Sequence, residues 1–316
     1  MDNILQWGLN CIALIQSYAS PPLTVVMRII TSLGSAQVFL ILLPLVYWCY
    51  DEKKGIRLGA ALLISAWINI SLKYLLNQPR PFFEGFDPSL GMIHETMGGF
   101  PSGHAQNSLV VFCIAASWGK KKRLYCLAAL VCLLTGFSRL YLGAHFPTDV
   151  AGGWLIGGVI LCVYFIFAER IAALTGAGGF RAGMIVSAAL ALVMILYRPG
   201  DEALMPGGMM LGLGAGWSLN RRFIGFGASG VFGRTGAAKY AVLAARFVLG
   251  IACMLLISAA FKKIIALNLL PGNSDIFNFV HFAAAALWVS AGAPYLFCFS
   301  RLAESNSTIV NVNDID

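Results

Sequence analysis

Long apolar runs recur along the chain, and short polar or charged segments separate them. A helix that crosses a bilayer needs about 20 apolar residues, or fewer where the membrane is locally thin. The pattern predicts nine membrane-spanning helices, with a tenth if residues 23–33 join the first: 35–50, 58–76, 105–118, 124–143, 151–168, 183–197, 206–218, 241–261 and 277–299. The predicted fold class is therefore all-α, a polytopic membrane helix bundle.

Composition agrees with a lipid environment. Of 316 residues, 59% are hydrophobic and only 11% are charged, and the mean hydropathy is +0.78. An ordinary soluble domain is roughly a quarter charged. Water is therefore the wrong solvent for most of this surface.

The excess of basic residues indicates how the helices are oriented in the membrane. The formal charge is +8, from 22 Lys and Arg against 14 Asp and Glu, and most of the basic residues lie in short loops. We therefore do not expect nucleic acid as a partner. The positive-inside rule makes the basic loops 51–57 and 119–123 cytoplasmic, together with Arg301 and the C-terminus, and turns residues 77–104 and 144–150 outward. Lys262 and Lys263 count weakly against this scheme.

The N-terminal residues are not typical of a cleaved signal peptide. They start with an acidic residue and lack a basic n-region. The apolar positions of residues 1–18 fit an amphipathic helix lying at the membrane interface, which Pro21 and Pro22 then interrupt.

Eight cysteines lie mostly inside apolar runs, and no CxxC pair or Cys/His cluster occurs. We expect buried thiols rather than disulfides or a metal site.

One polar segment follows the span 58–76. In KYLLNQPRP, Lys73 lies at the outer end of the span, where an ammonium is costly without an anionic partner. Snorkelling to the interface is the plain alternative. Arg80 lies between two prolines that restrict the backbone. Its planar fork matches phosphate oxygens, so this segment suits the binding of an anion.

A second segment, PSGH, precedes an apolar helix. Ser102 can cap that helix, and the backbone N–H groups of Gly103 and His104 would then face an incoming anion. The alternative is a simple capped helix start with an incidental histidine.

The third segment is SRLYLGAHFPTD. Arg139 is a charge inside a predicted span, which indicates function by default. His145 and Asp149 are four residues apart, so a helix would place them on one face, with the carboxylate fixing the imidazole tautomer. Pro147 makes a regular helix uncertain there, and a lone His–Asp pair is more often structural.

Together these residues suit one chemistry. Lys73, Arg80 and Arg139 can neutralise a phosphoryl group, and two histidines can divide nucleophilic attack and protonation of the leaving group. No carboxylate cluster suited to Mg²⁺ accompanies them. We therefore expect metal-independent phosphoester hydrolysis through a phosphohistidine, with no cofactor.

The three segments resemble the signatures KxxxxxxRP, PSGH and SRxxxxxHxxxD of the type 2 phosphatidic acid phosphatase (PAP2) superfamily, in the same order. The resemblance covers about residues 23–170 and implies a six-helix membrane core with its site at the membrane surface. It implies that His145 is the nucleophile, that Asp149 orients it, and that His104 is the general acid that later activates water. The phosphate-binding set that it implies is Lys73, Arg80, Ser102, Gly103 and Arg139.

Two regions follow: a PAP2-like catalytic core over 1–170 and an extension of about four transmembrane helices over 171–316. In the extension, LGLGAG suggests a phosphate loop, but Gly208, Gly212 and Gly216 form a small-xxx-small ladder that favours close helix packing. Gly153 and Gly157 repeat this pattern in the core.

Several polar residues lie outside the signatures. We expect His281 to be a satisfied polar residue of its span, and Asp201 and Glu202 to be solvated. The loop 82–100 is either part of a substrate gate or a wet connection; it holds Glu84, Asp87, His94 and Glu95.

The function that these residues favour is a membrane phosphatase for a phosphorylated lipid, active at the outer face, in a bacterial inner membrane or an internal eukaryotic one. A phosphotransferase that passes the phosphoryl group to another lipid or sugar is one alternative. Another is an anionic-lipid transporter, although binding alone does not need the combination of His104, His145 and Asp149.

Overall fold

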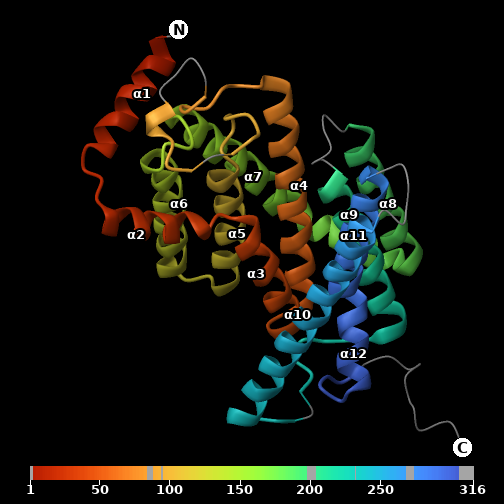
Figure 1. Ribbon diagram of the computed structural model, residues 1–316. Helices are drawn as coiled ribbons and strands as arrows, with labels where there is room; N and C mark the ends of the chain where they lie inside the picture. Colours follow the sequence, from red (N-terminus) through yellow and green to blue (C-terminus); the bar gives the residue numbers. More distant parts are fainter. Residues whose placement is uncertain are drawn as a thin grey trace, which may run out of the picture. The chain divides into compact units, whose positions relative to one another are not determined.

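The computed structural model describes residues 3–83, 88–93, 95–197, 204–231, 233–267 and 274–305, and these residues are almost entirely helical (Figure 1). The predicted all-α class is confirmed, since the β pairing among the described residues is one isolated bridge between Phe226 and Ser305. The helices are α1 (Asn3–Gln16), α2 (Pro21–Ser32), α3 (Ala36–Cys49), α4 (Glu52–Leu76), α5 (Gly103–Gly119), α6 (Lys122–Tyr141), α7 (Pro147–Ala177), α8 (Gly179–Leu196), α9 (Leu204–Leu219), α10 (Gly236–Ala266), α11 (Ser274–Leu287) and α12 (Ala293–Phe299).

Proline sets two of the helix starts. Pro21 opens α2, where its fixed φ and missing N–H cost nothing. The predicted interruption at Pro21 and Pro22 is confirmed, and the residues that follow form a helix of their own. Seven helices therefore precede residue 178, against the six of the implied core. Pro147 likewise opens α7.

Among the residues that the structure describes, six helices are long and apolar enough to cross a membrane by length and composition: α4, α6, α7, α8, α10 and the α11–α12 segment. A seventh span results if α2 and α3, bent by 48°, are counted as one. The prediction of nine spans is too high on this measure. Helices α3, α5 and α9 have only 14, 17 and 16 residues. At 1.5 Å per residue they reach about 21–26 Å, against about 30 Å of hydrocarbon.

The chain divides into two compact units, Met1–Leu40 with Ile64–Ile166, and Ile41–Leu63 with Phe167–Asp316. Helices α3, α4 and α7 contribute residues to both. The longer segment of the second unit begins at Phe167, and its other segment, Ile41–Leu63, lies within residues 1–170. The division into a catalytic core and an extension at residue 170 stays a prediction.

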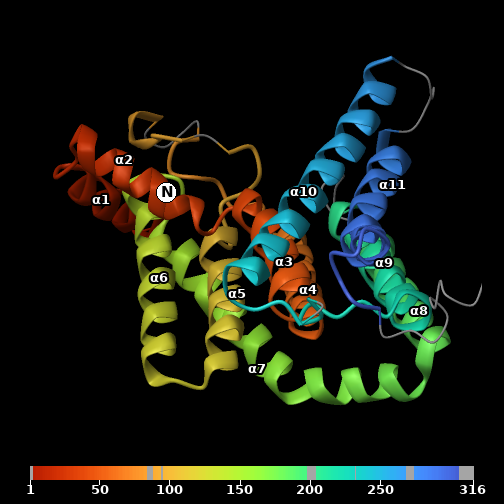
Figure 2. The same cartoon turned by 90° about the horizontal axis from the view of Figure 1, so that it is seen from below.

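In the first unit, α5 and α6 run side by side (Figures 1 and 2). The N-terminal helix packs against the loops that follow: Leu9 and Ile12 of α1 form a buried cluster with Leu90 and Phe146. Gln16 adds hydrogen bonds from Nε2 to the carbonyl oxygens of Leu90 (2.8 Å) and Tyr141 (2.9 Å). The end of α1 thus ties together loops that are distant in the sequence.

Glycines allow α7 to lie directly on the start of α5. A Cβ at Gly153 would be 2.6 Å from the carbonyl oxygen of Ser102, and one at Gly157 would be 3.0 Å from that of Gln106. The predicted close approach at these two glycines is confirmed. It fixes the PSGH turn against the first turns of α7.

In the second unit, α9 packs between α8 and α11. The predicted glycine ladder is confirmed: a Cβ at Gly208 or Gly212 would fall 2.5 Å or 2.1 Å from a backbone oxygen of α11. A Cβ at Gly216 would fall 2.0 Å from the side-chain Oγ of Ser290, in the π-helical segment Trp288–Gly292 that follows α11. These glycines lie inside a helix, so LGLGAG is a packing surface and not a phosphate loop.

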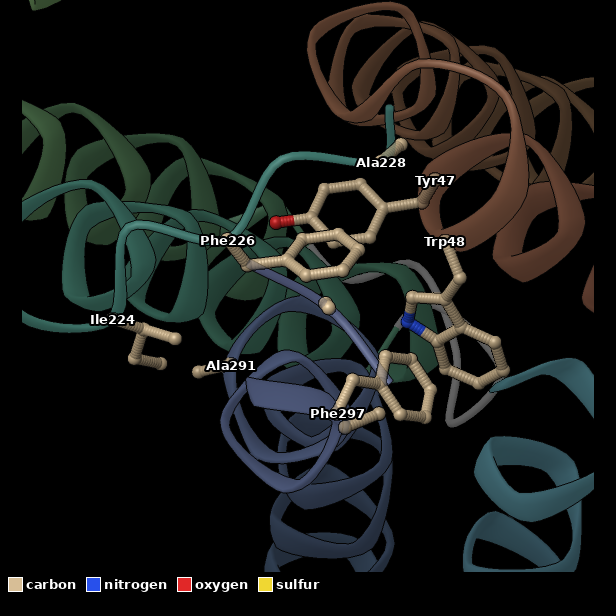
Figure 3. Packing of buried hydrophobic residues seen from close by; sticks show 9 residues of the cluster. Tyr47, Trp48, Ile224, Phe226, Ala228, Ala291 and Phe297 are labelled. Atoms are coloured by element: carbon tan, nitrogen blue, oxygen red, sulfur yellow. The ribbon is translucent and has the colours of Figure 1, made fainter. Parts of the chain in front are cut away.

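An aromatic cluster forms the core of the second unit (Figure 3). Trp48 and Phe297 meet edge to face with centroids 5.6 Å apart, and Phe226 stacks on Tyr47 at 6.3 Å. Arg246 lies over Phe226 at 5.5 Å, and in the described part of the chain its guanidinium donates to backbone carbonyls, including those of Trp48 and Ala228. This arginine therefore joins segments of the unit.

Two expectations about single residues are wrong. Only Cys132 is buried, and Cys126 and Cys162 are exposed, although all eight cysteines are free. An apolar segment in a membrane protein faces lipid as well as core, so it does not predict burial. His281 stacks on Phe261 and Phe282 at 5.0 Å, and its Nε2 has no hydrogen-bond partner among the described residues, so this ring nitrogen is not satisfied as expected.

Candidate active site

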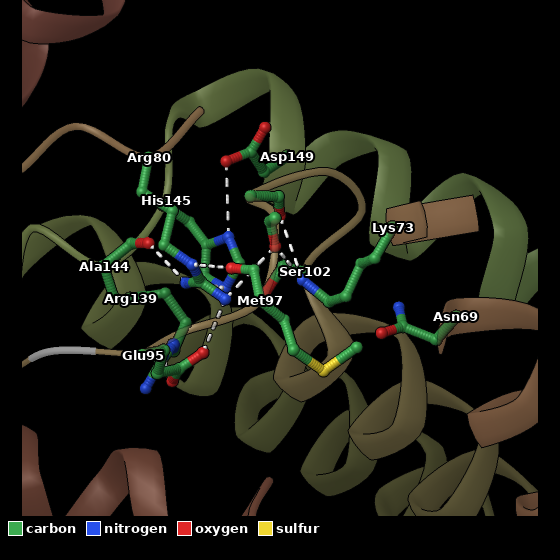
Figure 4. Close-up of polar contacts among 12 residues, drawn as sticks. Asn69, Lys73, Arg80, Glu95, Met97, Ser102, Arg139, Ala144, His145 and Asp149 are labelled. Carbon is green, nitrogen blue, oxygen red and sulfur yellow. Dashed lines mark hydrogen bonds and ion pairs between the residues drawn. The ribbon is translucent and has the colours of Figure 1, made fainter. Parts of the chain in front are cut away.

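The three sequence segments meet at one end of the first unit (Figure 4). Lys73 comes from the last turn of α4 and Arg139 from the last turn of α6. Ser102 caps α5, and Asp149 lies in the first turn of α7, just after His145. These residues lie together because the connection between α4 and α5 and the connection between α6 and α7 are both at this end of the unit.

His145 and Asp149 form a buried pair. The imidazole Nδ1 lies 3.2 Å from Asp149 Oδ2, and the two side chains are 1% and 0% exposed. His145 precedes the helix that Pro147 opens, so the pair does not depend on a shared helix face. The backbone N–H of Phe146 also donates to Asp149 Oδ2 (2.9 Å), and Gln78 Nε2 donates to Oδ1 (2.8 Å). The carboxylate is therefore held from three directions.

Arg80 touches the other nitrogen of the imidazole. Its NH1 lies 3.2 Å from His145 Nε2 and donates to the carbonyl oxygen of Ala144 at 2.8 Å. Its Nε donates to Met97 (2.6 Å), and NH2 donates to Gly98 (3.2 Å). With Nδ1–H directed at Asp149, Nε2 keeps its lone pair and accepts from the guanidinium.

Arg80 and Arg139 share one carboxylate. Glu95 Oε2 lies 2.7 Å from Arg80 NH2, and Glu95 Oε1 contacts Arg139 NH2. Both arginines are 1% exposed at the side chain. Arg139 NH1 also donates to Thr31 Oγ1 at 3.0 Å, while its buried Nε has no hydrogen-bond partner.

Lys73 is buried at the same end of the unit. Its Nζ donates to the carbonyl oxygens of Gly98 (2.6 Å) and Gly99 (3.3 Å), and the residue is only 6% exposed. Its ammonium therefore points to the site rather than to the interface, contrary to the snorkelling alternative.

The PSGH turn is held by backbone and side-chain contacts. The backbone N–H of Ser102 donates to the carbonyl oxygen of Asp149 at 2.9 Å, and its Oγ accepts from the N–H of Ala105 at 3.5 Å, as predicted for a cap. A Cβ at Gly103 would lie 3.0 Å from Asn69 Oδ1. His104 follows on α5, where burial and the charge of Arg139 lower its pKa to about 3, against the opposing effect of Glu95.

Sequence reasoning missed three polar residues that support the site. Asn69 donates to the carbonyl oxygen of Pro101 (3.2 Å) and to Gln106 Oε1 (2.9 Å), and Gln106 Nε2 donates to the Ser65 carbonyl oxygen at 2.8 Å. Gln78 is the third. A polar residue inside an apolar span indicates function, and this signal was present at Asn69 and Gln106. Of the acidic and histidine residues in loop 82–100, Glu95 is described; Glu84, Asp87 and His94 lie outside the described residues, as do Asp201 and Glu202.

Burial and charge set the protonation states at the site. Burial lowers the pKa of His145 well below its usual range, and the positive charges of Arg80, Lys73 and Arg139 lower it further, so the imidazole is neutral at pH 7. Burial alone raises the pKa of Glu95, but Arg139 and Arg80 outweigh it and hold that pKa at about 2. Burial lowers the pKa of Arg80, and Glu95 and Asp149 oppose this.

Two family models match the chain: the PAP2 superfamily over residues 54–172, and the transmembrane extension of PAP2 superfamily phosphatases over residues 204–305. Phosphatidylglycerophosphatase B of Bacillus subtilis (strain 168) is 30% identical over 164 residues, 48% of this chain and 78% of that protein. Undecaprenyl-diphosphatase BcrC of the same organism is 29% identical over 159 residues, 49% of this chain and 80% of that protein.

Among solved structures, the PAP2-type phosphatidylglycerolphosphate phosphatase from Bacillus subtilis is similar with a TM-score of 0.48 and 26% identity, over 54% of this chain and 88% of that one.

The match to the PAP2 superfamily and the relatives, which are named phosphatases, give the class of this protein as a membrane phosphatase. The chain belongs to the PAP2 superfamily.

Proposed function

We propose that this protein removes phosphate from a lipid through a phosphohistidine formed on His145, without a metal ion. The observation that carries the proposal is the orientation of the imidazole. Nδ1 is held by Asp149, so Nε2 carries the lone pair, which accepts from Arg80 NH1 until a bound phosphate takes that donor. A neutral, oriented imidazole next to a phosphate-binding cation is the arrangement that nucleophilic attack on phosphorus needs.

The reaction runs in two displacements. Nε2 of His145 attacks phosphorus, and the bond from phosphorus to the ester oxygen breaks. His104, which is neutral in the free site and takes up a proton when the anionic substrate binds, gives that proton to the leaving oxygen. Neutral His104 then takes a proton from water, whose oxygen attacks the phosphohistidine and frees His145. Asp149 stabilises the imidazole when phosphorus is bound to it.

The cations supply the electrostatic part of the reaction. Lys73, Arg80 and Arg139 converge on one region, and the first N–H groups of α5, at Gly103 and His104, add backbone donors. Charge spreads over the non-bridging oxygens as phosphorus is transferred, so fixed cations stabilise the transition state more than the ground state.

The substrate is proposed to be a lipid phosphomonoester or diphosphate. The names of the relatives support this, because they refer to phosphatidylglycerophosphate and to undecaprenyl diphosphate. We also propose a bacterial inner membrane, a site that faces outward and a cytoplasmic C-terminus. The basic run 120–123 lies at the opposite ends of α5 and α6 from the site. Fluorescence from a fluorescent protein fused to the C-terminus would support a cytoplasmic C-terminus. A fusion protein that is present in the membrane but does not fluoresce would indicate the opposite orientation.

The test is phosphate release by purified protein in mild detergent with EDTA present. The panel contains phosphatidic acid, phosphatidylglycerol phosphate, a polyprenyl diphosphate, a sphingoid-base phosphate and the water-soluble glucose 6-phosphate. We expect release from at least one lipid and its loss in His145→Ala. The matched control is His281→Ala, which changes a histidine of the second unit and should keep the activity. Radioactive phosphate from the substrate should label wild type and not His145→Ala.

Each outcome separates the candidates. Release that EDTA abolishes rejects the metal-independent mechanism. Folded protein that releases no phosphate but labels an added acceptor lipid is a phosphotransferase. Folded protein that binds lipid phosphates and neither cleaves nor transfers them supports a transporter and overturns the proposal.

A further inference from the structure

The Glu95 carboxylate occupies the anion-binding side of the two buried arginines. One oxygen lies 2.7 Å from Arg80 NH2, and the other contacts Arg139 NH2. Its side chain is 32% exposed, whereas both arginines are 1% exposed. The carboxylate therefore reaches the arginines from the open side of the site.

No other carboxylate among the described residues pairs with these arginines. Asp149 is committed to His145, Phe146 and Gln78. Two oxygens of one planar group bridging two guanidiniums form the arrangement that two phosphoryl oxygens would make. Glu95 and a phosphoryl group therefore compete for the same donors.

We propose that Glu95 is an internal competitor for the two arginines: its carboxylate takes the place of the phosphoryl oxygens in the free enzyme, and a bound substrate displaces it. This inference rests on the proposed phosphatase function. Glu95 weakens the binding of every anion by the same factor, so only a ligand that binds the arginines strongly occupies the site, such as a terminal phosphate with two negative charges in a lipid phosphomonoester or diphosphate.

The selection follows from charge. A terminal phosphate with charge near −2 is attracted to the two guanidiniums about twice as strongly as a carboxylate with charge −1, because the Coulomb energy scales with the product of the charges. A phosphodiester, with charge −1, gains no such advantage over Glu95. The headgroups of ordinary membrane phospholipids are phosphodiesters, so Glu95 keeps them from occupying the site.

Protonation does not relieve this competition near neutral pH. With its pKa held at about 2 by Arg139 and Arg80 against the effect of burial, Glu95 stays ionised at every pH well above 2. The charged groups that act on it are Arg139, Arg80, His104 and Lys73. Substitution is therefore the way to remove the competing charge.

The test is Glu95→Gln, which keeps the shape of the side chain and removes its charge. Competition with inorganic phosphate and with dibutyl phosphate, a soluble phosphodiester, is measured against hydrolysis of the best lipid substrate. We expect both inhibition constants to fall about tenfold, which corresponds to about 1.4 kcal/mol, and kcat to stay within about threefold. The matched control is Glu169→Gln, at an exposed glutamate paired with Arg57 in the second unit, with unchanged constants expected.

A purely structural Glu95, needed only to position the arginines, would give the opposite result: higher inhibition constants and a lower kcat. That result, or unchanged inhibition constants, overturns the proposal. If Glu95→Gln does not fold, Glu95→Asp decides. Its shorter side chain keeps the charge but reaches the arginines less well, so the inhibition constant of phosphate should fall several-fold, and an unchanged or raised value rejects the proposal. Wild type without any phosphate release rejects the proposed function itself, whereas active wild type with unaltered competition in the variants rejects only the role of Glu95.

Discussion

Replacing Asp149 by Asn tests whether the carboxylate works through His145. Three donors converge on this carboxylate: His145 Nδ1 and the Phe146 N–H on Oδ2, and Gln78 Nε2 on Oδ1. An amide accepts at its oxygen only, so its NH₂ group must face one set of donors. Gln78 can turn its own amide to accept, which lets the fold survive.

The expected loss is in kcat. An Asn in place of the orienting Asp of a serine-protease triad costs about 10⁴ in kcat through the wrong imidazole tautomer. Here the amide oxygen can keep the 3.2 Å contact with Nδ1, because Gln78 can accept from the NH₂ group. The loss then comes from the missing negative charge beside the imidazole, and we expect kcat to fall at least about tenfold, which is about 1.4 kcal/mol. KM should stay within about threefold, because Arg80 and Arg139 keep their positions.

The assay is phosphate release over a range of lipid concentrations, with Tm measured on the same preparations. The matched control is Asp51→Asn, since Asp51 also accepts a backbone N–H, that of Lys54 at 2.9 Å, but lies in the second unit. We expect its kcat to be unchanged. Folded Asp149→Asn protein with kcat within tenfold of wild type, or with a raised KM and normal kcat, would refute the orienting role.

Three further predictions follow from packing, charge and chemistry. Gly153→Ala places a methyl group 2.6 Å from the carbonyl oxygen of Ser102 and should lower the free energy of unfolding by about 1–3 kcal/mol. The control Gly158→Ala meets nothing within 4 Å and should leave Tm unchanged or raised. Equal Tm values for the two variants would contradict the packing. Since the pKa of His145 is lowered, its protonation should occur well below pH 6.5. The fall of kcat/KM on the acid side that is due to His145 should therefore also lie well below pH 6.5. A fall at or above pH 6.5 in wild type that substrate ionisation does not explain would refute this. Prolonged dialysis against EDTA should change the rate less than twofold, and a rate restored only by a divalent ion would refute the metal-independent mechanism.

The sequence predicted where the helices lie better than how many of them span the membrane. Each of the nine apolar segments is helical, since apolar residues in lipid must satisfy the backbone internally. Within the described part of the chain, six helices are long and apolar enough to span by themselves. An apolar composition indicates that a segment lies in a lipid environment. Crossing the membrane also requires sufficient length. A bend such as the one between α2 and α3 decides whether two helices form one span.

The chemical types at the site were visible in the sequence because they conflict with a lipid environment. Lys73, Arg139 and His145 are costly in or beside apolar spans unless something uses them. Their meeting at one end of the first unit was implied only by a resemblance to known signatures, and the structure places them together (Figure 4).

The sequence by itself determined the solvent, the helical class and the residues able to bind and attack a phosphate, because composition and local pattern carry that information. Only the tertiary structure decided which groups face one another. It placed Gln78 on Asp149, Asn69 on the PSGH turn and Glu95 between two arginines. Such pairings depend on how helix ends and loops meet in space, and no local spacing encodes the distance between them.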